Sequence, residues 1–161
     1  MAAPPRGSTG HGCYFITAST FQKRNLLQSD RIKKLLIDVL FHYRQLEKYR
    51  LHEFVIMSDH FHLLLTPGVT LERSMQFIKD GFAFRAKREL GFPHEIWQSS
   101  YYDRRVRDSE EYLAFARYIE QNPVKKGLVQ RSEQCWYSSA WPGLELDGIP
   151  QRLKRFEFVE A

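Results

Sequence analysis

Two histidines one residue apart, His60 and His62, stand inside an otherwise apolar run at 58–65 that reads Ser-Asp-His-Phe-His-Leu-Leu-Leu. Side chains alternate between the two faces of a β-strand. Both imidazoles are therefore expected on one face, while Phe61 and Leu63 point to the other. Two imidazoles placed in this way can bind one divalent metal ion from the same direction.

The elements expected around this strand follow from apolar spacing and turn residues. In chain order they are a strand at 13–21, a helix from 29 or 30 to about 49, strands at 51–57 and 60–66 joined by a two-residue turn, a helix at 70–90, an extended segment at 96–106, and a third helix that opens at Asp108 and stops at Asn122-Pro123. The first six elements predict an α+β, ferredoxin-like split βαβ fold, in which an antiparallel sheet carries two helices on one face. The third helix is additional.

The third helix carries Tyr118 and Asn122, which share a face because they are four residues apart. If this helix packs near the histidine strand, Tyr118 reaches a substrate held by a metal ion on His60 and His62, and Asn122 supplies an oxygen ligand. A phenol is a weak nucleophile at neutral pH, and a divalent ion on a phosphate makes the phosphorus more electrophilic. Taken singly, each of these residues is more common in packing or at a helix end, so their combination carries the prediction.

Net charge and aromatic content indicate the class of partner. The formal charge is +5, the pI is near 9.3, and aromatic residues make up 14% of the chain. A basic balance suits a polyanion, and aromatic side chains can stack on bases.

The cysteines and the hydropathy pattern indicate a reducing compartment. Cys13 and Cys135 form no Cys-x-x-Cys pair, which argues against a zinc finger or a redox site. No apolar run is long enough to span a membrane, and the first 12 residues, which lack the apolar core of a secretory signal, are expected to be a flexible leader. We therefore expect a cytoplasmic protein.

Several short segments between residues 13 and 140 share their pattern with one known family. They are Met-Ser-Asp-His-Phe-His at 57–62, Met-Gln-Phe-Ile-Lys at 75–79, Trp-Gln at 97–98, Tyr-Tyr-Asp at 101–103, Val-Arg at 106–107, Tyr-Ile-Glu-Gln-Asn-Pro-Val-Lys-Lys-Gly-Leu-Val at 118–129 and Trp-Tyr-Ser-Ser at 136–139. In these segments the chain resembles the single-tyrosine HUH transposases, in particular the REP-associated tyrosine transposases of bacteria. One departure is Ser58, where many relatives have proline in the hairpin turn.

The resemblance implies roles for the residues already singled out. His60 and His62 correspond to the HUH metal ligands, Asn122 to the polar ligand one turn past the tyrosine, and Tyr118 to the nucleophile that forms a 5′-phosphotyrosine on single-stranded DNA. The resemblance covers roughly residues 13–140, which are expected to form the transposase domain, with the leader at 1–12 before it and a C-terminal tail at 141–161 after it. The ion is expected to be Mg²⁺ or Mn²⁺, although imidazole ligands favour Mn²⁺ or Zn²⁺ over Mg²⁺.

Residues expected to bind DNA are basic or aromatic and lie near the predicted site. They are Lys79, Arg85, Tyr101, Arg104, Arg105, Lys125 and Lys126. Arg104 and Arg105 adjoin Tyr101 and Tyr102, and stacking combined with phosphate contact is how single strands are held.

The function that the resemblance implies is that of a metal-dependent transposase that cleaves and rejoins single-stranded DNA at hairpin-forming repeats. The expected partner is single-stranded or hairpin DNA, the expected state a monomer or homodimer in a bacterial cytoplasm. Two alternatives remain open: a domesticated hairpin-binding protein without catalysis, and a metal phosphodiesterase that uses water in place of tyrosine.

Overall fold

The computed structural model describes residues 12–93 and 95–153, and its sheet has the strand order β2-β3-β1-β4 with antiparallel neighbours. In chain order the elements are β1 (Tyr14–Ser19), η2 (Phe21–Lys23), α1 (Asp30–Gln45), β2 (Tyr49–Ile56), β3 (His60–Pro67), α2 (Leu71–Leu90), β4 (Tyr102–Arg105), α3 (Ser109–Lys125), η3 (Ser132–Gln134) and η4 (Gln151–Leu153). This order and topology confirm the predicted ferredoxin-like fold with a third helix. No described helix is long and apolar enough to cross a membrane.

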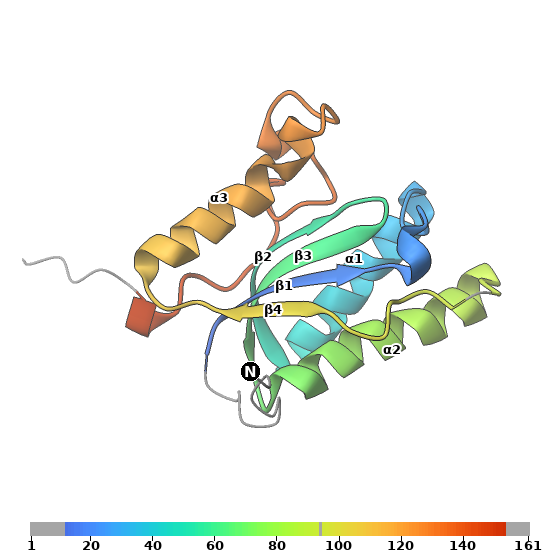
Figure 1. Cartoon of the computed structure of the whole chain (residues 1–161), viewed down its shortest axis with the longest axis horizontal. Helices are drawn as coiled ribbons and strands as arrows, with labels where there is room; N and C mark the ends of the chain where they lie inside the picture. The colour runs from blue at the N-terminus through green and yellow to red at the C-terminus, as the bar shows by residue number, and fades with distance from the viewer. Residues whose placement is uncertain (1–11, 94, 154–161) are drawn as a thin grey trace, which may run out of the picture.

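The two faces of the sheet are covered by different helices, α1 and α2 on one side and α3 on the other (Figure 1). Phe61, Leu63 and Leu65 of β3 belong to the core beneath α1 and α2. Leu64 packs instead with Ile119 of α3. Because the side chains alternate, His60 and His62 lie together on the α3 face. The sequence predicted that they share a face but not which helix covers it.

The first helix ends at Gln45, so the prediction that it continues to about Tyr49 is wrong. Glu47 adopts a left-handed conformation with φ of 60°, and the backbone N–H of Lys48 donates to the carbonyl of Tyr43. Tyr49 then opens β2, and its hydroxyl donates to the carbonyl of Leu40. A buried Tyr49 is consistent with the apolar spacing of either a helix or a strand. Periodicity alone therefore extends the predicted helix too far.

The third helix runs through Pro123 to Lys125, so the prediction that it stops at Asn122-Pro123 is also wrong. Proline lacks one backbone donor, and in the last turn of a helix this removes a single hydrogen bond. The helix ends after Lys125 with Lys126 as its C-cap, and the next residue, Gly127, has a left-handed φ of 72°. Asn122 therefore lies inside the helix, and its side chain is held by regular helical geometry.

Residues after α3 return along the outer edge of β2. The carbonyl of Tyr137 accepts from the N–H of Ile56, the N–H of Ser139 donates to the carbonyl of Phe54, and the N–H of Asp147 donates to the carbonyl of Leu51. The part of the predicted tail that falls within the described residues, 141–153, thus lies against the sheet. The predicted leader up to residue 11 and residues 154–161 lie outside the described residues.

Candidate active site

The histidine pair is held at the start of β3, directly after the turn at Ser58 and Asp59. The turn is closed by the N–H of Met57, which donates to the carbonyl of His60, and it is tied to the loop after β1 by Thr20 and Leu27, whose N–H groups donate to the carbonyls of Asp59 and Ser58. These bonds fix the turn without a proline at residue 58.

Each imidazole has its Nδ1 atom engaged by a neighbouring side chain. Nδ1 of His60 lies 2.7 Å from Oδ1 of Asp59, and Nδ1 of His62 lies 2.9 Å from Oγ1 of Thr17. The two ring centroids are 4.7 Å apart. Such contacts orient an imidazole and leave its Nε2 atom to bind a metal ion.

His62 is a neutral imidazole whose Nε2 atom is unused. Its side chain is buried, with 4% of its surface exposed, and burial followed by the charge of His60 lowers its pKa to about 3. Within the described part of the chain, Nε2 of His62 and Oδ1 of Asn122 are buried without a hydrogen-bond partner. An unpaired buried polar atom is costly, so both atoms are suited to a ligand.

Helix α3 brings Tyr118 beside this pair. The ring centroids of Tyr118 and His62 are 5.3 Å apart at 74°, and 47% of Tyr118 is exposed. Along α3, the aromatic side chains contact the sheet progressively nearer to His60. Tyr112 contacts the ring of His52, and Phe115 stacks on Phe15. Tyr118 then contacts His62. Asn122 follows one turn later on the same side.

The ring of Phe15 in β1 contacts His62, Phe115 and Tyr118. It stacks on His62 and Phe115, at centroid distances of 5.4 and 4.4 Å, and meets Tyr118 edge-on at 6.0 Å and 80°. Phe15 and Thr17 could not be singled out from the sequence, because their proximity to His62 depends on the pairing register of β1 with β3.

The donor set fits a divalent metal ion held by two nitrogens and one amide oxygen. Among the described residues no three His, Cys, Asp or Glu side chains cluster closely enough to hold a metal ion. A metal ion bound by His60 and His62 would therefore take a different third protein ligand, and the unpartnered Oδ1 of Asn122 fits that role.

Three of the predicted DNA-binding residues lie on or beside the histidine face. Arg104 of β4 pairs with Phe15, and its guanidinium binds the Glu111 carboxylate at 3.2 Å. Lys125 and Lys126 are exposed at the end of α3, one turn beyond Asn122.

The other predicted DNA-binding residues lie elsewhere. Lys79 donates to the carbonyl of Gln98 and stands 5.8 Å from the ring centroid of Tyr101, which packs against the core beneath α1 and α2. Arg85 pairs with Glu89 on α2. Arg105 is paired with Tyr14, whose side chain belongs to that same core, so Arg105 is on the face opposite the histidines.

Glu53 links β2 to α3 and to the segment that follows it. Ser139 Oγ donates to its carboxylate, and Glu120 of α3 forms a second hydrogen bond with it. Burial, with the Glu120 carboxylate adding and Ser139 opposing, raises the pKa of Glu53 to about 7. The hydrogen bond between Glu53 and Glu120 therefore fastens the tyrosine-bearing helix to the sheet.

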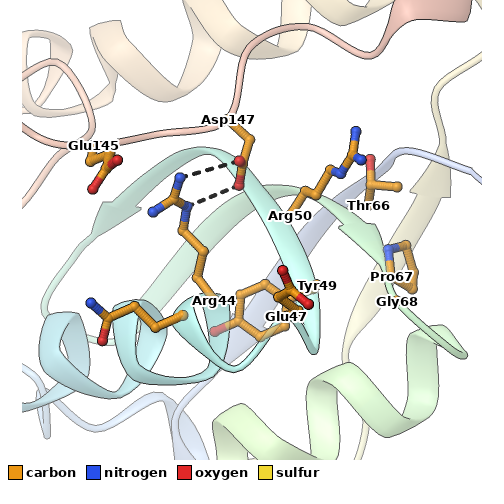
Figure 2. A pocket seen from close by; sticks show the side chains of 10 residues that line it. Arg44, Glu47, Tyr49, Arg50, Thr66, Pro67, Gly68, Glu145 and Asp147 are labelled. Atoms are coloured by element: carbon orange, nitrogen blue, oxygen red, sulfur yellow. Dashed lines mark hydrogen bonds and ion pairs between the residues drawn. The ribbon is translucent and has the colours of Figure 1, made fainter.

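A hollow of about 830 Å³ lies at the outer edge of β2, around the ion pair of Arg44 with Asp147 (Figure 2). Charged side chains of both signs line it, and Arg44 and Asp147 already neutralise each other through two hydrogen bonds. The residues predicted for the metal and the tyrosine are not among those that line it.

Comparisons with known proteins agree on one kind of relative. Residues 11–122 match the family described as IS200-like transposases. A protein of Haemophilus influenzae described as a REP-associated tyrosine transposase is 26% identical over 165 residues, which cover 91% of this chain and 89% of the relative.

Two solved structures share the fold. One, a REP-associated tyrosine transposase bound to a REP hairpin, matches with a TM-score of 0.69 at 20% identity, over 98% of this chain and 99% of that chain. The other, described as a transposase from Deinococcus radiodurans, matches with a TM-score of 0.52 at 24% identity, over 74% of this chain and 97% of that chain.

Proposed function

We propose a reaction for this chain, which belongs to the family of IS200-like transposases. It cleaves and rejoins single-stranded DNA at hairpin-forming repeats through a covalent 5′-phosphotyrosine on Tyr118. The observation that carries this proposal is the half-exposed phenol of Tyr118 beside the neutral, buried imidazole of His62.

In the proposed reaction the phenolic oxygen of Tyr118 attacks the phosphorus of the scissile phosphodiester. A bond forms between Oη and phosphorus while the bond from phosphorus to the 3′-oxygen breaks. The phenolic proton passes to solvent, and the released 3′-oxygen takes up a proton. Since the new ester retains the energy of the old one, a 3′-hydroxyl that attacks the phosphotyrosine rejoins the strand without ATP.

His60, His62 and Asn122 are the residues that would hold a divalent ion, Mg²⁺ or Mn²⁺. When bound, the ion would neutralise charge on the phosphate oxygens and make the phosphorus more electrophilic. Asp59 and Thr17 hold the two imidazoles by their Nδ1 atoms, and the buried Nε2 and Oδ1 atoms without partners support the assignment.

The proposed partner is hairpin DNA with a single-stranded flank. The solved relative bound to a REP hairpin supports this choice, and so does the charge of +5. The ring of Tyr118 lies against that of His62 in the single chain, which supports an active site completed within one molecule.

The test replaces Tyr118 by phenylalanine, which removes one oxygen atom and keeps the ring. Protein is incubated with Mn²⁺ or Mg²⁺ and end-labelled single strands of the repeats that flank its own gene, then run on a denaturing gel. We expect a covalent adduct with the unmodified protein and none with Tyr118→Phe, while both bind the hairpin within about twofold. Tyr43→Phe, which removes a phenolic hydroxyl on the other side of the sheet, is the matched control.

The products separate the alternatives. An undiminished adduct with Tyr118→Phe would remove Tyr118 from the mechanism. A free 5′-phosphate without adduct would identify a hydrolase that uses water, and tight hairpin binding without any cleavage would identify a binding protein.

A further inference from the structure

Tyr102 of β4 lies in the same row of the sheet as His62. Thr17 of β1 pairs with His62 on one side and with Tyr102 on the other. Directly paired residues of antiparallel strands point to the same face, so all three side chains are on the α3 face. With strands 4.7–4.9 Å apart, His62 and Tyr102 are separated by roughly 10 Å, which is within the reach of one nucleotide.

The rings of Tyr102 and Tyr118 both contact the ring of Phe15. Phe15 is almost fully buried, and it meets Tyr102 edge-on at 6.4 Å and 71°, as it meets Tyr118 at 6.0 Å and 80°. Tyr102 is 55% exposed, so most of this aromatic surface faces water although it lies beside the site.

The neighbouring Tyr101 is placed differently, because successive strand residues alternate faces. Its ring packs against the core beneath α1 and α2 and stands near Lys79. Of the two adjacent tyrosines, only Tyr102 is directed toward the histidine face.

Arg104, two residues further along β4, is on the same face as Tyr102. It binds Glu111, and the phenol of Tyr102 is a further group that faces it. An exposed aromatic ring followed by a guanidinium on one side of a strand is the combination that holds a base and its backbone phosphate.

We propose that Tyr102 is the platform on which the base next to the scissile phosphate stacks, with Arg104 on the adjoining backbone. The inference rests on the proposed function, since it takes the scissile phosphate to lie between Tyr118 and the histidine pair. It adds a residue that positions the strand and that favours a flanking base with a large aromatic face. Tyr102 takes no part in the bond changes.

The test uses 2-aminopurine in place of the base on either side of the scissile phosphate, with Tyr118→Phe protein so that the strand stays intact. We expect binding to quench the fluorescence of the probe at one of the two positions. Adding Tyr102→Leu should abolish this quenching and weaken binding roughly 10-fold. Adding Tyr102→Phe, which keeps an aromatic ring, should retain both.

Phe84→Leu is the matched control, because Phe84 is also an exposed aromatic ring but belongs to α2 on the far side of the sheet. An abasic site at the quenched position should weaken binding by the same factor as Tyr102→Leu, and the two changes together should weaken it no further. Unchanged quenching with Tyr102→Leu, or losses that simply multiply, would overturn the inference.

The two proposals fail in different ways. If the unmodified protein neither cleaves the strand nor forms an adduct, no scissile phosphate defines the probe positions, and the inference fails together with the proposed function. If an adduct forms and Tyr102→Leu leaves the quenching intact, the inference about Tyr102 fails alone.

Discussion

Replacing Glu53 by glutamine should make the protein more stable at alkaline pH and leave it unchanged at acid pH. Glu53 is half-buried between β2 and α3, and its pKa is raised from 4.5 to about 7. Between these two values the folded protein holds the proton more tightly than the unfolded chain. The free energy of unfolding therefore falls as the pH rises through this window, and the loss is complete above it.

The size of the effect follows from the same pKa. At 1.36 kcal/mol per pKa unit, ionisation of Glu53 in the folded protein lowers the free energy of unfolding by about 3 kcal/mol. Glutamine carries no charge and still accepts the hydrogen bond from Ser139. The free energy of unfolding of Glu53→Gln should thus exceed that of the unmodified protein by up to about 3 kcal/mol at about pH 8. The two free energies should be equal near pH 4.5.

Urea unfolding followed by tryptophan fluorescence at a series of pH values measures both free energies. Glu133→Gln, at an exposed position paired with Arg131, is the control and should follow the unmodified protein at every pH. Parallel pH profiles for Glu53→Gln and the unmodified protein would refute the reasoning.

Three further predictions concern the site. His60→Ala combined with His62→Ala should abolish metal-dependent cleavage, and unchanged activity in a cleavage assay would refute the metal assignment. Thr17→Val keeps the shape of the side chain and removes the hydroxyl at Nδ1 of His62, so the metal concentration needed for half-maximal cleavage should rise by 10- to 100-fold, as measured by Mn²⁺ titration. Arg104→Ala should reduce the salt dependence of DNA binding by about 0.7 in log–log slope, and Arg105→Ala, on the opposite face, should reduce it less; equal slopes would show that the face of β4 does not matter.

Local patterns were enough to predict the elements and the face of the histidines. The alternation around His60 and His62 depends only on strand geometry, and the spacing of Tyr118 and Asn122 depends only on helix geometry. Both predictions hold in the folded protein, because a strand or helix keeps its side-chain periodicity whichever element packs against it.

Placement of the third helix required the whole fold. Leu64 is an apolar residue on the histidine face of β3, and it indicates that something covers that face without indicating what. The choice between Tyr101 and Tyr102 needed the register of β4 against β1. The partners of His62, namely Thr17 and Phe15, depend on strand pairing across 45 or more residues, which local periodicity does not encode.

The segment that lies along the outer edge of β2 determines how far the chain can be shortened for study. A chain cut at residue 140 would lose Asp147, whose carboxylate accepts from the buried N–H of Leu51 and from Arg44. Each lost hydrogen bond would lower the free energy of unfolding by about 0.5–1.5 kcal/mol, and the bared strand would invite pairing with other molecules. Expression of a trimmed protein for crystals or NMR should therefore keep the chain at least through Gly148, whose carbonyl also binds His52.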